Sequence, residues 1–382
     1  MIAKSIKGKN PHEIQKALND SISSDFNPTL ALVFCGVTQD RETICEMLDK
    51  ENISIFGSTA AGEFVDGELG WETITVMLME MDRTHFQIVY EETGDRTDRD
   101  AAISIGNKGL EHFNKPAFII CASKTASDGD MIIKGLKDSC GSDVRVFGGM
   151  SGMQVGVWGN SYVFTKGLEI DYGIMALVID EEKYELHGFA SCGWKPVGTV
   201  KTITKSEGCW VHTIDDEPAL DIFIKYMGID DHEITDREND PLPDIGSNFP
   251  MELQRDNGSF VMRTAMRGNW ETRSFMCAGS VPEESKIRFT LPADFDVIQD
   301  VILECEEVKN TSINEADALI VFSCFARFIA FGPLLSKEIQ GMKDIWDAPT
   351  AGFFTFGEFG RAKGADQEFH NITCSWVALK EK

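Results

Sequence analysis

The chain of 382 residues is long enough for about two domains, and its 42% hydrophobic and 26% charged residues are typical of a globular protein with a large core. Its formal net charge of −26 repels phosphate backbones and anionic lipids, which argues against binding to nucleic acid or to a membrane. We interpret the acidic surface as a feature that keeps the protein in solution.

The cysteines and the N-terminal segment indicate a reducing compartment. The segment MIAKSIKGKNPHE lacks the apolar region of a signal peptide, and no apolar run approaches the roughly 18 residues of a membrane span. Cys35, Cys121 and Cys324 lie in or at the end of apolar runs, where a free cysteine acts as a small hydrophobic residue. The ten cysteines form no CxxC pair, and the histidines lack ligand spacing. We therefore expect a cytoplasmic protein with these three cysteines buried and outside disulfides, and with no metal site or cofactor.

The first half of the chain alternates apolar runs of strand length with segments of helical periodicity. It predicts helices over 11–21, 38–50 (with Thr38 as N-cap), 101–113 and about 131–139. It predicts strands over 30–35, 53–57, 72–81, 86–91, 117–122, 144–148, 161–165, 172–179 and 184–190.

The second half begins with different material and then returns to the same alternation. Strands are predicted over 199–205, 209–214, 260–265, 271–278 and 286–291, and helices over 219–227 and 295–308. The segment 318–360 then reads as a buried strand, a helical segment LLSKEIQGMKDIW and a second apolar strand that ends in GEFG. A last strand is predicted over 371–379.

Three segments share one order of features. LVFCG…IFGSTAAGEF, FIICAS…VFGGMSGM and IVFSCF…GFFTFGEFG each contain an apolar strand ending near a cysteine, a helix, a second strand and a glycine-rich turn. We expect a mixed α/β fold in which repeated strand–helix–strand units form mixed sheets covered by helices, in two regions. The regions are predicted to span 1–214 and 215–382.

Two charged residues stand where the strands of the third segment end. Arg327 follows its first strand and Glu358 follows its second, and the ends of neighbouring strands converge in an open α/β sheet. The guanidinium needs a partner, either an internal carboxylate such as Glu358 or the carboxylate of a ligand. As a ligand clamp, Arg327 should be partly exposed and should face one cavity with Glu358.

The glycine-rich turns are expected to line the same cavity. The turn from Gly57 to Gly62, which includes Ser58, has the glycine spacing of a phosphate loop, but Glu63 stands where that motif needs lysine. We therefore exclude a nucleotide and expect backbone N–H groups to face a carboxylate, with a turn that needs positive φ as the plain alternative.

Further candidates come from the second turn and the last strand. They are Gly148 and Gly149, and His370 and Asn371, which open the last strand. A turn with an exposed histidine is the alternative for the latter pair. Cys324 is a candidate nucleophile with His370 as its base, although a cysteine in an apolar strand is usually inert packing.

Several of these motifs together resemble one family. FGSTAAGEF, VFGGMSG, KPVG…ITKSEG…IDDEPALDIF, FSCFARFIAFG and GFFTFGEFG…FHNITCSWVAL are similar, in this order, to the FIST sensory family, with its N- and C-terminal FIST domains. The resemblance covers nearly the whole chain. It implies a ligand-binding sensory module in signal transduction, proposed to bind small molecules such as amino acids.

The resemblance sets the expected function and its alternatives. The chain carries no kinase, cyclase, methyl-accepting or F-box segment, so a signal would pass through an unknown partner protein. Arg327 for a carboxylate, with Glu358 or Glu63 for an ammonium group, would match an amino acid. The alternatives are a thiol-dependent hydrolase that uses Cys324 or Cys121, and a scaffold without a small ligand.

Overall fold

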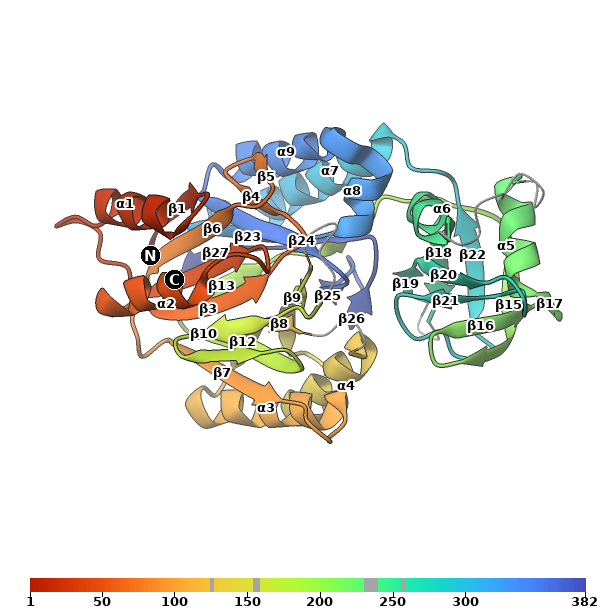
Figure 1. The fold of residues 1–382 in the computed structure, drawn as a ribbon, viewed down its shortest axis with the longest axis horizontal. Coiled ribbons are helices and arrows are strands. Elements are labelled where there is room, and N and C mark those ends of the chain that lie inside the picture. Colours follow the sequence, from red (N-terminus) through yellow and green to blue (C-terminus); the bar gives the residue numbers. More distant parts are fainter. Residues whose placement is uncertain (124–126, 154–158, 230–239, 256–257) are drawn as a thin grey trace.

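The computed structural model describes residues 1–123, 127–153, 159–229, 240–255 and 258–382. A large body is built from three units, and a smaller lobe stands beside it (Figure 1). Each unit of the body runs strand, helix, strand, helix, strand, short hairpin, strand.

The first two units follow each other directly along the chain. The first contains β1 (Ile2–Gly8), α1 (Pro11–Ser21), β2 (Leu30–Cys35), α2 (Arg41–Lys50), β3 (Ser54–Thr59), the hairpin of β4 (Glu63–Val65) and β5 (Glu68–Gly70), and β6 (Ile74–Glu80). The second contains β7 (Phe86–Glu92), α3 (Asp98–His112), β8 (Pro116–Ala122), α4 (Gly129–Cys140), β9 (Arg145–Met150), the hairpin of β10 (Val163–Thr165) and β11 (Leu168–Ile170), and β12 (Gly173–Asp180).

The third unit is interrupted after its first strand by the lobe. It begins with β13 (Tyr184–His187) and β14 (Ala190–Ser191) and resumes with α7 (Phe295–Thr311), β23 (Ala318–Cys324), α8 (Phe325–Phe331), a 3₁₀ turn (Gly332–Leu335) and α9 (Ser336–Trp346). It ends with β24 (Thr350–Thr355), the hairpin of β25 (Glu358–Arg361) and β26 (Gln367–His370), and β27 (Cys374–Glu381).

Each unit lends its hairpin to the sheet of another unit. The hairpin β4–β5 pairs with β24, β10–β11 pairs with β3, and β25–β26 pairs with β9. The three sheets therefore share one plan, with orders β1-β6-β2-β3-β10-β11, β7-β12-β8-β9-β25-β26 and β13-β27-β23-β24-β4-β5. The central pair of each sheet is parallel, as expected for strands joined by a helix. The exchange closes a ring of three sheets.

A phenylalanine and a glycine meet wherever a borrowed hairpin joins its host strand. The pairs are Phe164 with Gly57, Phe359 with Gly148, and Phe64 with Gly352. A Cβ on Gly57 would lie 2.3 Å from the ring of Phe164, and one on Gly352 would lie 2.3 Å from the ring of Phe64. Gly148 instead adopts a φ of 143°, which few residues with a Cβ adopt. These glycines let one unit fit closely against another.

One apolar core fills the centre of the ring, and helices cover the outside. The inner faces of the three sheets pack together, with Phe34, Phe322 and Phe353 in mutual contact. Helices α1 and α2 cover the first sheet, α3 and α4 the second, and α7 and α9 the third (Figure 1). Strands buried on both faces explain why the sequence shows continuous apolar runs rather than alternation.

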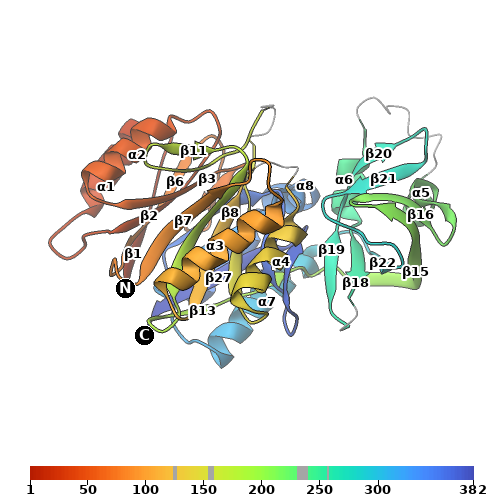
Figure 2. The ribbon, with the colours of Figure 1, turned by 90° about the horizontal axis from the view of Figure 1, so that it is seen from below.

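The lobe is a separate antiparallel structure with its own core. It contains β15 (Pro196–Glu207), β16 (Trp210–Ile214), β17 (Glu217–Pro218), α5 (Ala219–Met227), α6 (Leu242–Asn248), β18 (Met251–Gln254), β19 (Phe260–Arg263), β20 (Ala265–Asn269), β21 (Ser274–Cys277) and β22 (Lys286–Thr290). Figure 2 shows it at one end of the body, and α6 packs against α8. The boundary expected between Ile214 and Asp215 falls between β16 and β17, which pair with each other inside this lobe.

The mixed α/β fold class is confirmed, and the three similar segments are the central parts of the three units. The predicted helix over 38–50 begins instead at Arg41, with Asp40 as its N-cap. Strand β1, helix α8 and the exchanged pairing of the hairpins were not foreseen. None of the helices in the described part of the chain is long and apolar enough to cross a membrane.

All ten cysteines are free, and Cys35, Cys121 and Cys324 are buried, as predicted. They are not equivalent in the three units. Cys121 faces the central core, whereas Cys35 and Cys324 pack in the outer cores under the helices. The similarity of the cysteine positions along the sequence therefore does not extend to their place in the fold.

Candidate functional site at the junction of the three units

The turns that follow β3, β9 and β24 are hydrogen-bonded to one another. Ser58 Oγ lies 2.8 Å from Ser151 Oγ, and Thr59 Oγ1 donates to the carbonyl of Gly152 at 3.0 Å. The N–H of Phe354 donates to the carbonyl of Gly62 at 2.8 Å, as the N–H of Met150 does to that of Gly357. The structure thus brings the predicted turns together, with their serine and threonine side chains buried.

The predicted glycines are required by close packing more than by their backbone angles. A Cβ on Gly62 would lie 2.5 Å from the ring of Trp71, and one on Gly149 would lie 2.3 Å from Cγ2 of Thr355. Gly57 and Gly62 do not have positive φ, whereas Gly148 does. The plain alternative, a turn that needs positive φ, therefore applies only to Gly148 among the predicted glycines.

Glu358 is fully buried at this junction. In the sheet, its backbone lies opposite Gly149 of β9 on one side and opposite His370 of β26 on the other. Its Oε2 accepts from the N–H and the hydroxyl of Thr373 at 3.2 and 3.0 Å, and its Oε1 lies 2.5 Å from Thr355 Oγ1. Burial, only partly offset by these hydrogen bonds, raises the pKa of Glu358 to about 7.

The surroundings of Thr355 favour the protonated form of Glu358. The hydroxyl of Thr355 also lies 3.2 Å from the carbonyl oxygen of Ser323. A hydroxyl carries one hydrogen and can accept others, so Thr355 satisfies both neighbours by donating to Ser323 and accepting from a carboxylic acid. Among the described residues, no lysine or arginine pairs with Glu358.

Glu63 occupies the equivalent position in the first unit, but its hairpin joins β24, whereas the hairpin of Glu358 joins β9. Its Oε2 accepts from the hydroxyl and the N–H of Thr73 at 2.9 and 3.3 Å, as Glu358 accepts from Thr373. Burial raises the pKa of Glu63 to about 8. Glu63 pairs with Phe353 of the third sheet, so it does not share a site with Glu358.

Arg327 does not pair with Glu358, and its guanidinium is 0% exposed rather than partly exposed. It lies in α8, beyond the strand end, and forms a two-point ion pair with Glu338 of α9. The expectation of partial exposure is therefore wrong. The physical reason is that a helix follows β23 directly and turns the side chain toward α9 instead of toward the sheet edge.

Arg327 and Glu358 nevertheless meet the same loop, residues 370–373. Arg327 Nη1 donates to the carbonyls of Cys192 and Ile372 at 2.9 and 3.1 Å, and Glu358 holds the N–H of Thr373. Ile372 has a φ of 57°, a conformation that a β-branched residue rarely adopts. Strain of this kind persists only when the surroundings hold it, and it concentrates at functional sites.

The lobe closes over this loop at a region that we call the waist. The body contributes Asp130 and Phe369–Asn371, and the lobe contributes Arg263, Thr264, Ala278 and Ser280. Arg263 is 1% exposed and donates to both oxygens of Asp130 at 2.8 and 2.9 Å. It also donates to the carbonyl of Phe369 at 3.0 Å. Arg255 and Glu368 extend the same network.

The waist contains buried polar atoms without a hydrogen-bond partner among the described residues. They are His370 Nε2, Asn371 Oδ1 and Thr264 Oγ1. Asn371 donates to the carbonyl of Ala278 at 3.0 Å, and the N–H of Ala278 donates to Thr264, so these residues adjoin. Burial, together with the charges of Arg263 and Arg255, lowers the pKa of His370 to about 3, which leaves a neutral ring.

The sequence analysis missed Arg263. An arginine inside the otherwise apolar run FVM-R-TAM is the one signal that could have marked it, because a guanidinium in a buried strand must have a partner. Its partner Asp130 comes from another part of the chain, in the first turn of α4.

The candidate nucleophiles are protonated thiols. Burial raises the pKa of Cys121 to about 12, and burial next to Glu358 raises the pKa of Cys324 well above its usual value. A thiol in such surroundings does not supply the thiolate that nucleophilic catalysis requires. In the described ranges, no group of three or more histidine, cysteine or carboxylate side chains has the arrangement of a metal site.

Two family models match the chain. The model of the FIST N domain matches residues 29–217, and that of the FIST C domain matches residues 219–361. FIST domains are sensory domains of signal transduction proteins and are thought to bind small ligands. No curated protein matches the chain. The matched ranges include the second unit, the lobe and most of the other two units, but not β1, α1, β26 and β27.

Proposed function

Because the chain belongs to the FIST family, we propose that it is a cytoplasmic sensor that binds an amino acid or a related carboxylate at the waist. Its signal then passes to a partner protein. The ten free cysteines support the cytoplasmic setting, since such thiols persist in a reducing compartment.

The unpartnered polar atoms of the waist carry this proposal. A buried polar atom without a hydrogen bond costs about 1–3 kcal/mol, so a protein rarely keeps several together without a use for them. At the waist, His370 and Asn371 of the body and Thr264 of the lobe supply three. A ligand that bonds to atoms on both sides would hold the lobe against the body.

The charges at the waist suit a zwitterion. Arg263 can meet a carboxylate with two parallel hydrogen bonds, and Asp130 can meet an ammonium group. These two residues now pair with each other across the waist, so an amino acid could replace each partner with its own opposite charge. Glu358, which pairs with no cation among the described residues, lies beside His370, and an ammonium group there would lower its raised pKa and make it a second anionic partner.

The other predicted residues support the waist in this proposal. Ser58 and Gly62 hold the junction together, as do Gly148 and Gly149 through their fit with neighbouring strands. Cys324 donates its N–H to the carbonyl of Thr373 and so anchors the loop 370–373. Direct contact between Arg327 and the ligand stays a prediction, and it would require the ligand to compete with Glu338.

A thermal-shift screen tests the ligand class. The twenty amino acids are compared with matched compounds that lack either the amino group or the carboxylate. A ligand present at about 100 times its Kd stabilises the folded protein by about 2.7 kcal/mol, which raises Tm by a few degrees. We expect at least one amino acid to raise Tm, and we expect its carboxylate-free amine to have no effect. If no amino acid or carboxylate raises Tm, the proposed ligand class is wrong.

A further inference from the structure

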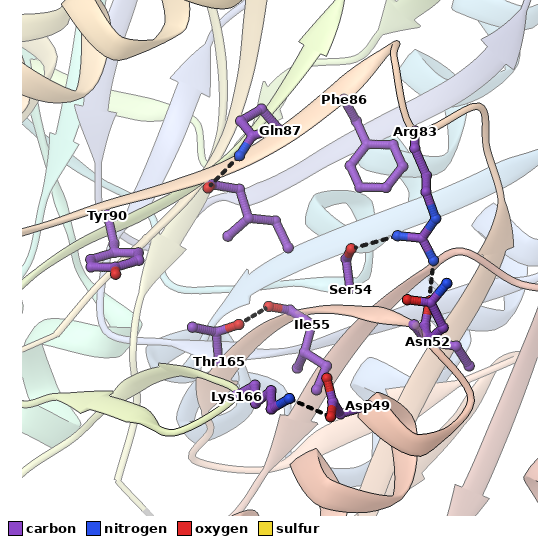
Figure 3. Close-up of a pocket in the computed structure, with 12 residues that line it drawn as sticks. Asp49, Asn52, Ser54, Ile55, Arg83, Phe86, Gln87, Tyr90, Thr165 and Lys166 are labelled. Atoms are coloured by element: carbon purple, nitrogen blue, oxygen red, sulfur yellow. Dashed lines mark hydrogen bonds and ion pairs between the residues drawn. The ribbon is translucent and has the colours of Figure 1, made fainter.

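A groove separates the first and second sheets on the side of the body away from the waist. It has a volume of about 370 Å³, and Figure 3 shows the side chains along it. One wall is β7, the edge strand of the second sheet, with Phe86, Ile88 and Tyr90. The opposite wall is formed by the α2–β3 connection and the turn of the β10–β11 hairpin, with Asp49, Ser54 and Lys166.

The free edge of β7 faces this groove. Alternate residues of a strand direct their N–H and C=O groups to the same side. The carbonyl of Ile88 accepts from the side chain of Gln87, that of Tyr90 from Lys108 Nζ at 2.7 Å, and that of Glu92 from Arg96. These three carbonyls bond to side chains rather than to β12. The backbone groups of the even-numbered residues of β7 therefore point to the free edge of the sheet. Phe86, Ile88 and Tyr90 therefore direct their backbone groups to the groove, where the carbonyls of Ile88 and Tyr90 meet side chains and no neighbouring strand.

The equivalent edges in the other units are tied to the neighbouring sheet. In the first unit, Ser5 and Lys7 of β1 bond to Asp66 and Glu68 beside the β4–β5 hairpin. In the third unit, Arg145 of the second sheet donates to the carbonyl of Leu186 in β13. Among the described residues, no hydrogen bond joins β7 to the β10–β11 hairpin, so β7 differs from β1 and β13 in having no such tie to its neighbour.

Arg83 gives the groove an unbalanced positive charge at one end. It donates to Ser54 Oγ at 3.1 Å and to the carbonyl of Asn52, and no carboxylate pairs with it in the described part of the chain. Lys166 on the other wall is already paired with Asp49. In a protein of net charge −26, an exposed arginine without a counter-charge beside a free strand edge favours an acidic occupant.

We propose that β7 is a docking edge for an extended segment of a partner polypeptide, which adds as a strand and places a carboxylate side chain opposite Arg83. Backbone hydrogen bonds to Ile88 and Tyr90 supply the affinity, and the charge at Arg83 selects the sequence. A second copy of this chain fits less well, because two copies of a chain with a net charge of −26 repel each other. The proposal is independent of the ligand site at the waist.

Synthetic peptides test the proposal with the full-length protein. The probes are 12-residue peptides of alternating threonine and valine with a central glutamate, glutamine or lysine, and their affinities are measured by fluorescence anisotropy at low ionic strength. We expect the glutamate peptide to bind about tenfold more tightly than the lysine peptide. Arg83→Glu should reverse this preference. Arg99→Glu is the matched control, because Arg99 is a similarly exposed arginine that pairs with Asp138 on α4, and it should leave both affinities unchanged.

A backbone substitution tests strand addition separately. Ile88→Pro removes an N–H that faces the groove and leaves the bonds between β7 and β12 in place, since proline is tolerated on the free side of an edge strand. With Tm unchanged, it should weaken binding by about tenfold or more. If this variant is unstable, the Arg83→Glu result decides. Failure of all peptides to bind, binding that neither variant alters, or a dimer that Ile88→Pro dissociates would overturn the proposal.

Discussion

Glu63 and Glu358 begin two of the exchanged hairpins, and each is bound through one oxygen by the N–H and the hydroxyl of a threonine. In the second unit the corresponding residue of the hairpin is Val163. A glutamate at this position is therefore not needed for a hairpin to pair with the sheet of another unit. Burial raises the pKa of both glutamates, to about 8 and about 7, so each keeps its proton where an exposed carboxyl has lost it.

Stability should therefore fall as pH rises. Between about pH 4.5 and the raised pKa values, the folded protein holds protons that the unfolded chain has released, and this linkage lowers the free energy of unfolding with increasing pH. The loss is on the order of 3 kcal/mol for Glu358, nearly complete by about pH 8, and on the order of 5 kcal/mol for Glu63, nearly complete by about pH 9. It can be measured by urea unfolding from pH 5 to pH 8.5.

Glu358→Gln should remove part of this pH dependence. A glutamine amide can donate to Thr355 and accept from Thr373, as the protonated acid does, so the variant should exceed the parent in stability at pH 8 and match it near pH 5. Glu252→Gln is the control, because that buried carboxylate pairs with Arg288. A parent and a Glu358→Gln variant with the same slope against pH would show that Glu358 is ionised throughout.

The buried pair of Arg327 and Glu338 should behave as one unit. Replacing one partner leaves a buried charge alone, so Arg327→Met and Glu338→Leu should each cost about 3–5 kcal/mol. The double variant loses the pair together and leaves only the carbonyls of Cys192 and Ile372 without their donor, so it should cost less than either single change. Chemical denaturation of the four proteins measures this. Additive losses would contradict the description of an isolated ion pair.

At the scale of elements, the exchanged hairpins decide how the three units join. Each hairpin has two strands of three or four residues, and its partner strand belongs to another unit. A strand this short has little stability of its own, so packing against the host sheet must supply it. The contact between phenylalanine and glycine at each joint is the feature common to all three.

Gly57→Ala tests this contact. The added methyl group would overlap the ring of Phe164 and should cost about 1–3 kcal/mol. A smaller side chain in Phe164→Leu should relieve much of that cost in the double variant. Gly352→Ala is the contrast, because its methyl group would also lie 1.9 Å from the carbonyl oxygen of Val321. Phe64→Leu should therefore not rescue it, and equal rescue at both positions, measured by Tm, would contradict this account.

The sequence predicted the central strands and their helices because continuous apolar runs such as LALVFC fit only a strand buried on both faces. It could not predict the hairpin exchange, since pairing between units leaves no local pattern. It named Glu358, Gly149 and His370 for one site, and the exchanged hairpin brings these three residues together by antiparallel pairing, while a shared ligand cavity stays a prediction. The partner of Arg327 was missed because α8, in FARFIAF, has the apolar composition of a strand.

At the scale of the whole molecule, the lobe breaks the similarity of the three units. It is inserted between β14 and α7, and it returns to cover the loop 370–373 of the same unit. Its contact with the body combines a buried ion pair with unpartnered polar atoms. Because these polar atoms lack partners among the described residues, the proposed ligand would favour the arrangement in which the lobe packs against the body.

Calorimetric titration of Thr264→Val tests most directly whether the waist is the ligand site. The strongest ligand from the thermal-shift screen is titrated into the parent, Thr264→Val and Thr93→Val. Both threonines are buried with an unpartnered hydroxyl, but Thr93 lies in the body after β7 and has no described contact with the lobe.

Each change should leave the protein without ligand as stable as the parent or more so, because it removes an unsatisfied hydroxyl group. We expect Thr264→Val to raise the Kd about tenfold or more and Thr93→Val to leave it within about twofold. Equal affinity of Thr264→Val and the parent would contradict the placement of the ligand at the waist.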